Sequence, residues 1–335
     1  MSAEPAVPRH MPVVGSVTSR MSVVSVIQRS ASMVVLVVVL AIGAIAFGGN
    51  FASAQNLQNI AVAASFLAVV SAGMTFVIIS GGIDLSVGSM LALGAVLAAW
   101  SSQWGSVPAI VVPLVVCTAQ GVVHGLLIGR RGLPPFIVTL AGLLFARGLA
   151  FYVSDDGNTT HLIRSGMNVS FLGQGRILGI GVPLVIAAVV FALGGIALNR
   201  TRYGQAVYAV GGAEEAAKLA GVRVANIRVR LYAVSGLLAG LAGLLVAARS
   251  SSGLSTIGNG LELEAIAAVV IGGTLLSGGS GSLTGTLAGV LLLEVIQNLI
   301  NQVGTLSSYY QQVVSGVFLI VVVVVQAYLS RREAR

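Results

Sequence analysis

Residues 80–89 read Ser80-Gly81-Gly82-Ile83-Asp84-Leu85-Ser86-Val87-Gly88-Ser89 and form a polar, glycine-rich break between two long apolar runs. Asp84 is the only acidic residue between Glu4 and Asp155. A carboxylate with about twenty lipid-compatible residues on either side costs roughly 2.5–3.5 kcal/mol to insert into a bilayer, so it must face protein or a water-filled cavity. The stretch therefore predicts a broken-helix or re-entrant element near 80–89.

The residue types within this break indicate how it is built. Gly81 and Gly82 allow the backbone to leave one helix without a side-chain penalty, and Asp84 or Ser86 can cap the first turn of the next helix. Asp84 is either a cap at the membrane edge, a common use of aspartate before an apolar run, or a group that faces a passage through the membrane. Both roles stay open at this point.

The composition indicates an all-α polytopic membrane protein, embedded in a lipid bilayer. The 335 residues are 56% hydrophobic and only 8% charged, whereas a soluble domain carries about 25% charged residues. The net charge of +8 does not indicate a nucleic-acid partner, because the basic residues gather on the loops of one membrane face. Cys117 is the only cysteine, which excludes an internal disulfide and a cysteine metal cluster.

About ten apolar runs are long enough to cross a bilayer. We expect spans near 31–49, 58–80, 85–100, 107–128, 134–153, 177–198, 231–249, 262–277, 283–303 and 309–330. Residues 1–30 would form a flexible cytoplasmic tail and 331–335 a second tail, around a transmembrane domain at 31–330 with a cytoplasmic loop at 199–230. Fourteen of the 18 basic residues then fall in the inner loops and tails, which predicts that both ends of the chain lie inside.

Glycine spacing predicts how the spans pack. Glycines four residues apart let helix backbones approach closely in lipid, and they recur at Gly121/Gly125/Gly129, Gly236/Gly240 and Gly285/Gly289. In addition, Ser277-Gly278-Gly279 echoes Ser80-Gly81-Gly82 at an offset of 197 residues, as Gly285 echoes Gly88. A parallel internal repeat is one explanation, and chance in a chain with 43 glycines is the other.

No group of side chains predicts an enzyme, a cofactor or a metal site. The three histidines, His10, His124 and His161, have no partner at metal-ligand or catalytic-triad spacing. Lys218 is the only lysine and lies outside any Walker phosphate loop, so we expect no ATPase site in this chain. If ATP drives the protein, another chain must bind it.

The loop at 199–230 contains a candidate docking element for such a chain. Glu214 and Glu215 would occupy the first turn of a short helix, with Lys218 near its end and Gly221 at its terminus, as the helix dipole and capping favour. The element is either a coupling helix or a solvated connector.

Three blocks of sequence resemble the permease subunits of ribose-type bacterial ABC sugar importers, the binding-protein-dependent monosaccharide permeases. They are Gly81 to Gly88; Tyr208 to Gly212 with Ala216, Ala217 and Gly221; and Glu264 to Thr274 with Gly278 and Gly279. The resemblance covers about residues 55–330. Within it, Gly273 to Gly279 and Gly304 to Ser308 look closest to the galactofuranose-type permease.

The resemblance implies a permease that carries a monosaccharide, such as galactofuranose, ribose or a related sugar, across the bacterial cytoplasmic membrane. It also implies a second permease chain, in a homo- or heterodimer, with cytoplasmic ATP-binding subunits and an extracytoplasmic sugar-binding protein. By the same resemblance Glu214, Glu215, Ala217 and Gly221 match the segment that engages the ATPase. The alternatives are an ion-coupled sugar carrier and an ABC permease for branched-chain amino acids.

Four further residues are site candidates by their chemistry. Asn298 and Asn301 offer hydrogen bonds to a neutral sugar on the pathway past the helix break, and they can equally bond helix to helix. Glu262 and Glu264 open the eighth expected span, where they suit the positive end of a helix and could also dock a basic surface of the binding protein.

Overall fold

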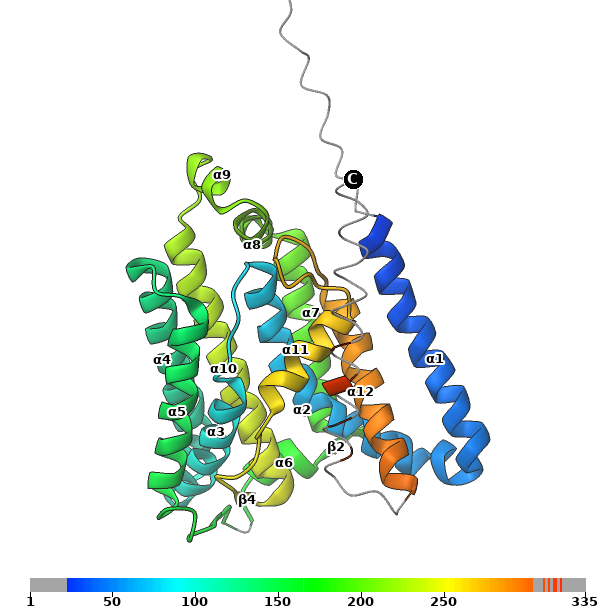
Figure 1. The fold of residues 1–335 in the computed structure, drawn as a ribbon. Helices are drawn as coiled ribbons and strands as arrows, with labels where there is room; N and C mark the ends of the chain where they lie inside the picture. The colour runs from blue at the N-terminus through cyan, green and yellow to red at the C-terminus, as the bar shows by residue number, and fades with distance from the viewer. Residues whose placement is uncertain are drawn as a thin grey trace, which may run out of the picture.

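The structure is a computed structural model that describes residues 23–164, 166–303, 310, 313, 316, 317 and 320. It is a bundle of α-helices with two very small sheets (Figure 1). The helices are α1 (Val23–Ala52), α2 (Ala54–Ile79), α3 (Val87–Ser101), α4 (Ser106–Arg131), α5 (Pro135–Val153), α6 (Val169–Gln174), α7 (Val182–Arg200), α8 (Arg202–Gly212), α9 (Glu214–Leu219), α10 (Val224–Ser250), α11 (Leu261–Ile271) and α12 (Leu283–Val303).

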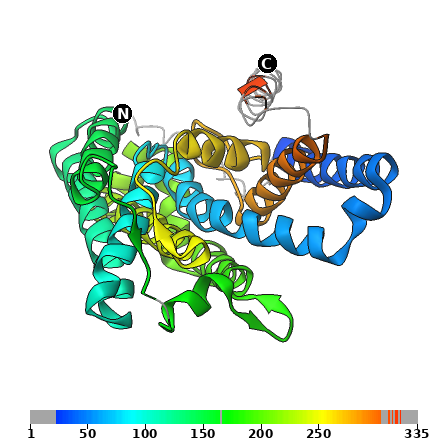
Figure 2. The same cartoon turned by 90° about the horizontal axis from the view of Figure 1, so that it is seen from below.

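Helix α10 is the centre of the bundle, where it packs against α4, α3 and α2. Seen from below, α4 and α5 lie on one side, α1 and α12 on the other, and α2 runs between them (Figure 2). The expected glycine seams are confirmed. A β-carbon on Gly125 of α4 would collide with the α10 backbone at Val229, and one on Gly289 of α12 would collide with the carbonyl oxygen of Ala268 on α11. Glycine therefore sets how closely these helices approach.

Seven helices in the described part of the chain are long and apolar enough to cross a membrane, and they match seven of the ten expected spans. Helices α3 and α11 have 15 and 11 residues. At a rise of about 1.5 Å per residue they reach only about 22 and 16 Å, less than the roughly 30 Å of a bilayer core. Helix α3 coincides with the expected span 85–100 to within two residues, but by itself it is too short to cross. The span expected at 262–277 is wrong beyond Ile271, because the glycine-rich break that follows interrupts it. The tenth expected span and both tails lie largely outside the described residues.

Two other boundaries differ from expectation. The span expected at 177–198 begins only at Val182, because the chain first forms a tight hairpin in which β2 (Arg176–Ile177) pairs with β3 (Ile180–Gly181). The span expected at 231–249 begins earlier, since α10 starts at Val224 and so takes up the end of the 199–230 loop. The second sheet pairs β1 (His161–Leu162) with β4 (Ser252–Gly253).

The two ends of the bundle differ in their construction. The small strands and α6 lie at the lower end in Figure 1, whereas α8 and α9 lie at the upper end together with the start of α1. Helices α2 and α11 both run towards the upper end and stop there or short of it, and α3 and α12 both run away from it. The expected break near 80–89 is thus confirmed, and α11 and α12 frame a second one at 272–282.

Candidate functional site

The first break begins where α2 ends. Gly81 has a φ of +80°, and the backbone N–H groups of Gly81 and Gly82 donate back to the carbonyls of Ile78 (2.9 Å) and Val77 (3.0 Å). This is the Schellman stop, which needs a residue that tolerates the left-handed conformation. The non-helical chain then runs back along the bundle before α3 begins at Val87 (Figure 1).

Asp84 holds this break through its side chain. Its carboxylate is fully buried and accepts hydrogen bonds from the Ser86 backbone N–H (3.0 Å), from the Ser86 hydroxyl (2.5 Å) and from the Ser235 hydroxyl on α10 (2.7 Å). Ser86 occupies the N-cap position of α3, but it makes no side-chain cap. The cap expected of Ser86 is therefore wrong, because its hydroxyl donates to the buried Asp84 carboxylate instead. Asp84, by contrast, accepts the N–H two residues on, in the turn that leads into α3, which is the hydrogen bond of a cap.

Neighbours that the sequence did not single out complete the environment of Asp84. The Tyr232 hydroxyl on α10 donates to the Ile83 carbonyl (3.2 Å) and stands against Gly82. His124 on α4 is buried and lies close enough to Asp84 to interact with its charge. These residues are far apart in sequence, and only the packing of α4 and α10 brings them to the break. Of these residues, the sequence analysis named only His124, and it did not pair it with Asp84.

The second break is built differently. Helix α11 ends in another Schellman stop, with Gly273 at a φ of +88° and the Thr274 N–H donating to the Val269 carbonyl (3.2 Å). The chain within the break is held largely by backbone hydrogen bonds, such as that from the Leu275 N–H to the Ser280 carbonyl (3.1 Å). The buried Thr274 hydroxyl has no hydrogen-bond partner in the part of the chain that the structure describes.

The two breaks meet at the end of α8. The Gly279 N–H donates to the Ile79 carbonyl at the end of α2 (2.8 Å). A β-carbon on Gly211 would collide with that same carbonyl oxygen and would stand 2.6 Å from the Gly279 nitrogen, and one on Gly278 would stand 2.8 Å from the Gly81 nitrogen. Three glycine-containing segments thus touch backbone to backbone, and the Tyr208 hydroxyl of α8 adds a hydrogen bond to the Gly281 carbonyl (2.8 Å). We call this contact of Gly81, Gly211, Gly278 and Gly279 the glycine junction.

Helix α9 follows the glycine junction directly, and its charges anchor it. Glu214 forms ion pairs with Arg228 of α10 (2.5 Å) and with Lys218 (3.1 Å), while Glu215 pairs with Lys218 (2.8 Å). Partial burial by itself raises the pKa of Glu214, but the Lys218 hydrogen bond and the Arg228 and Lys218 charges outweigh it, so the pKa lies below its usual value. Hydrogen bonds to Glu215 and Glu214 raise the pKa of Lys218. Both shifts favour the charged forms.

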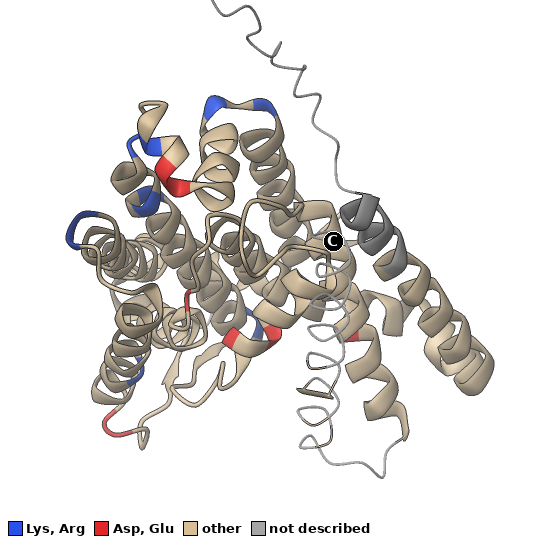
Figure 3. Cartoon of the chain, turned by 45° about the horizontal axis from the view of Figure 1, so that its top comes forward, with Lys and Arg blue, Asp and Glu red and all other residues tan. Residues whose placement is uncertain are grey.

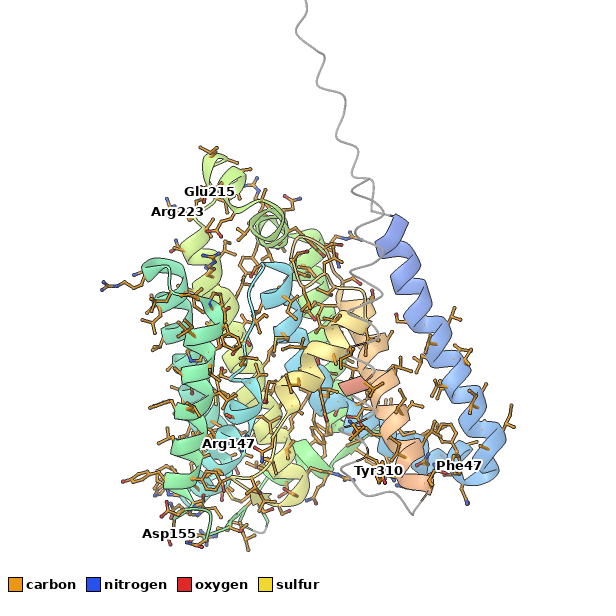
Figure 4. The ribbon with its side chains drawn as sticks, in the orientation of Figure 1. Phe47, Arg147, Asp155, Glu215, Arg223 and Tyr310 are labelled. Carbon is orange, nitrogen blue, oxygen red and sulfur yellow. The ribbon has the colours of Figure 1, made fainter. Side chains whose placement is uncertain are left out.

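The structure separates the four expected coupling residues by the direction they face. Glu215 lies in the first turn of α9 (Figure 4) with its side chain 85% exposed, whereas Ala217 is buried. Gly221, at a φ of +84°, closes α9 as the sequence predicted, with the Val222 N–H donating to the Ala217 carbonyl (3.0 Å). Leu219, which the sequence analysis did not single out, is 90% exposed. The outward face of α9 therefore combines Glu215 with a bare apolar side chain.

Glu262 and Glu264 point into the bundle. Helix α11 begins above the level of α6 and β4 (Figure 1), and both of its acids are partly buried. The Glu262 carboxylate accepts hydrogen bonds from its own backbone N–H and from that of Gly260, and it packs against Gly88 at the start of α3. Glu264 hydrogen bonds to Gln297 on α12. Arg147 of α5 attracts Glu262 and donates to the Ser255 and Ile257 carbonyls.

Asn298 and Asn301 are not near the first break. Asn298 exchanges hydrogen bonds with Asn56 in the first turn of α2 (2.9 and 3.1 Å) and accepts one from Gln302. Asn56 and Ser80 lie at opposite ends of α2, about 35 Å apart at the helical rise. The structure therefore gathers Gly81, Gly82, Asp84 and Ser86 in the first break, with Gly81 in the glycine junction and Asp84 against α10, and it places Asn298 at the far end of α2.

The arrangement links a surface element to two interrupted membrane helices. The end of α8 makes backbone contacts with both breaks, and α9 follows it directly along the chain. Within the described residues, no group of three or more His, Cys, Asp or Glu side chains could hold a metal ion. Irregular backbone at membrane depth is typical of transporters, where it lines protein or water-filled cavities.

Comparison with known proteins finds a family that contains this site. Residues 56–323 match the family described as branched-chain amino acid transport system / permease component, and this range includes both breaks and α9. The Inner membrane ABC transporter permease protein YjfF of Escherichia coli (strain K12) is 41% identical over 288 residues, which cover 84% of this chain and 86% of that protein.

Two further relatives carry the name of a sugar. The Ribose import permease protein RbsC of Escherichia coli (strain K12) is 40% identical over 297 residues, covering 88% of this chain and 92% of that protein. The L-arabinose transport system permease protein AraH of the same strain is 34% identical over 306 residues, covering 90% and 91%. No solved structure matches the chain.

Proposed function

Because the chain belongs to the family of branched-chain amino acid transport system permease components, we propose that it is the membrane-spanning permease subunit of an ATP-driven importer for a monosaccharide. Its seven membrane-length helices make it a multi-pass membrane protein, as its relatives are. The observation that carries the proposal is this family match, in a chain where α8, the helix directly before the expected coupling helix α9, makes backbone contacts with both helix breaks.

The substrate class follows from the relatives rather than from the family description. The names of RbsC and AraH specify ribose and L-arabinose, which supports a monosaccharide as cargo. Galactofuranose, ribose or a related sugar is the substrate we propose. A path for branched-chain amino acids would need groups that complement both a carboxylate and an ammonium, whereas the one charged group of the first break, Asp84, already has its hydrogen-bond partners within the protein.

We propose ten spans with both ends of the chain in the cytoplasm, so that the α9 end of the bundle is the inner one. Basic residues gather at that end, at the α4–α5 and α7–α8 turns and beside α9 (Figure 3), which the positive-inside rule supports. Residues 1–30, 199–230 and 331–335 are then cytoplasmic, and the sugar-binding protein delivers its cargo to the opposite end. The pathway forms between this chain and a second permease chain.

In this proposal α9 contacts the ATP-binding subunit and is displaced when that subunit changes conformation. Leu219 and Glu215 are the groups that a partner can reach, and Glu214 transfers force to α10 through Arg228. The glycine junction passes displacement of α8 to the ends of both interrupted helices without flexible side chains between them. Asn298 and Asn301 on the pathway, and Glu262 and Glu264 in docking the binding protein, stay proposals of the second rank because their side chains bond within the bundle.

The test is transport by the reconstituted complex of this chain with its ATP-binding subunit and binding protein. We expect ATP-dependent uptake of a radiolabelled monosaccharide, unchanged by a protonophore, and no ATP hydrolysis by the purified chain alone. Leu219→Asp and Gly221→Pro should lower uptake at least tenfold, the first by placing a charge in the contact and the second because proline cannot adopt a positive φ. Uptake that persists without ATP and collapses with the protonophore would favour the ion-coupled carrier, and competition by leucine would favour the amino-acid permease.

A further inference from the structure

A basic cavity lies beside α9, where α4 turns into α5. Its volume is about 480 Å³, and its charged lining residues are Arg130, Arg131, Glu214, Lys218, Arg223 and Arg228. They come from the end of α4, from α9 and from the start of α10, so three separate parts of the chain form one cavity. Figure 3 shows the basic residues of these parts at the same end of the bundle.

The cavity has excess positive charge that this chain does not neutralise. Five basic side chains line it against one carboxylate. That carboxylate, Glu214, is already paired with Lys218 and Arg228. Across the described residues, Arg130, Arg131 and Arg223 form no ion pair with any acid. Three unpaired guanidinium groups around one hollow fit a phosphate, which arginine binds in bidentate fashion.

An apolar surface begins at the rim of this cavity. Gly132 lines the cavity, and the next residue, Leu133, is 45% exposed. On α5, Phe136, Ile137 and Leu140 follow with exposed fractions of 56%, 61% and 39%, and their spacing of three and four residues places them on one face of the helix. This surface continues towards the middle of the bundle at Leu144, which is 66% exposed. The cavity therefore opens directly onto a surface suited to lipid chains.

We propose that the basic cavity binds the phosphate headgroup of an anionic phospholipid, whose acyl chains lie along the exposed face of α5. A soluble phosphate would use the arginines but not the apolar face, and an acidic segment of a protein partner would leave that face bare as well. Basic pockets at the ends of membrane helices suit anionic headgroups in this way. The bound lipid would share Glu214, Lys218 and Arg228 with α9, and so would sit at the base of the coupling helix.

The test is lipid binding to the full-length chain in detergent, measured by native mass spectrometry with dioleoyl phosphatidylglycerol as the probe and dioleoyl phosphatidylcholine as the neutral reference. The Arg130→Gln/Arg223→Gln variant should bind phosphatidylglycerol about 25-fold more weakly, because each basic residue near an anionic headgroup contributes roughly fivefold. The matched control is Arg200→Gln/Arg202→Gln, which removes the same charge at the α7–α8 turn outside the cavity, and it should change binding less than twofold. Arg130→Lys/Arg223→Lys keeps the charge but loses the bidentate guanidinium contacts, so its binding should lie between that of the glutamine variant and that of the unaltered protein.

Each other outcome overturns the proposal. Equal weakening in both glutamine variants means general surface charge and no site. Displacement of phosphatidylglycerol by millimolar inorganic phosphate means a soluble-anion site. Unchanged lipid binding together with lost association of the ATP-binding subunit means that a protein occupies the cavity. Because all variants are compared by their unfolding temperature first, misfolding cannot imitate the expected result.

Discussion

The two helix breaks both interrupt a helix inside the bundle, but different interactions hold them in place. Each interrupts the chain after a helix that runs towards α9, and each begins with a glycine-based Schellman stop, at Gly81 and at Gly273. The first is then held by side chains, because the Asp84 carboxylate gathers Ser86 and Ser235 around itself. The second is held mainly by backbone hydrogen bonds and close glycine packing, with one side-chain bond from the Tyr208 hydroxyl of α8 to the Gly281 carbonyl and no buried carboxylate.

The difference shows where the structure can yield. A buried carboxylate with three donors fixes one geometry, since moving it leaves several polar groups unsatisfied. The glycine-rich loop of the second break has no buried carboxylate, so displacing it together with α8 leaves fewer polar groups unsatisfied. We therefore expect the first break to act as the fixed pivot and the second as the part that moves, with the glycine junction between them transmitting displacement.

The largest effect is expected at Asp84. Asp84→Ala leaves the Ser86 N–H and the Ser86 and Ser235 hydroxyls without their buried acceptor, so it should cost about 3 kcal/mol or more of folding stability. We expect little recoverable complex and no uptake. Recovery by size-exclusion chromatography, thermal unfolding and sugar uptake measure the three effects.

Asp84→Asn tests whether the charge itself matters. Asparagine keeps an acceptor oxygen for Ser86, and the Ser235 hydroxyl can rotate to accept from its amide, so the complex should assemble and retain most of its uptake. If Asp84→Asn abolishes uptake while assembly and ATP hydrolysis stay normal, the carboxylate belongs to the transport pathway and the pivot interpretation is wrong.

The next effect is expected at the glycine junction. Gly211→Ala places a methyl group against the Ile79 carbonyl and the Gly279 nitrogen, which should force the two breaks apart at a cost of about 1–3 kcal/mol. In the reconstituted complex we expect uptake to fall at least tenfold while ATP hydrolysis continues.

Gly212→Ala is the matched control for this prediction. It lies one residue along in the same helix, where the new methyl group would meet only the Gly279 α-carbon at an ordinary 3.9 Å. Its uptake should stay within twofold of the unaltered protein. If the two variants behave alike, close backbone contact at Gly211 does not transmit coupling.

The sequence predicted the first break and missed most of what surrounds it. An acid inside an apolar run is conspicuous, so Asp84 was found, together with the glycines that end α2. Ser235, Tyr232 and His124 were not predicted as its neighbours, because they lie on other helices and have no local pattern. The periodicity of apolar residues in a sequence predicts which face of a helix is buried, but it does not predict which residues of other helices that face contacts.

The echo between the two breaks was visible in the sequence, but its alignment misleads. Gly88 and Gly285, 197 residues apart, both fall in the first turn of the second helix of their pair. The helix stops at Gly81 and Gly273 lie only 192 apart, because the second break is longer. The two Ser-Gly-Gly triplets are not equivalent in position, yet they touch: Gly278 stands against Gly81. Sequence comparison could show the likeness but not the contact.

A smaller effect, on the unfolding temperature, is expected from the ion pairs of Glu214 that hold α9 against α10. The folded pKa of Glu214 is lowered from its ordinary 4.5, so its ion pairs stabilise the fold above that pH, and this stabilisation is lost as the pH falls through the lowered value. The unfolding temperature of the unaltered protein should exceed that of Glu214→Gln at pH 7. The difference should vanish between about pH 5 and pH 3. A difference that is independent of pH would mean that packing, and not charge, anchors α9.

The smallest effect is expected within the second break, at Thr274. Its hydroxyl is buried with no hydrogen-bond partner among the described residues, so Thr274→Val removes an unsatisfied polar group and keeps the shape. Unfolding should be unchanged or shift by up to about 1 kcal/mol towards greater stability. The comparison is Ser235→Ala, which takes one donor from Asp84 in the first break and should cost about 1.5–3 kcal/mol, the range for a hydrogen bond to a charged group. Chemical denaturation of both variants in the same detergent measures the contrast directly. If Thr274→Val costs as much as Ser235→Ala, the second break also depends on a side-chain hydroxyl, and the division between a fixed pivot and a moving loop no longer holds.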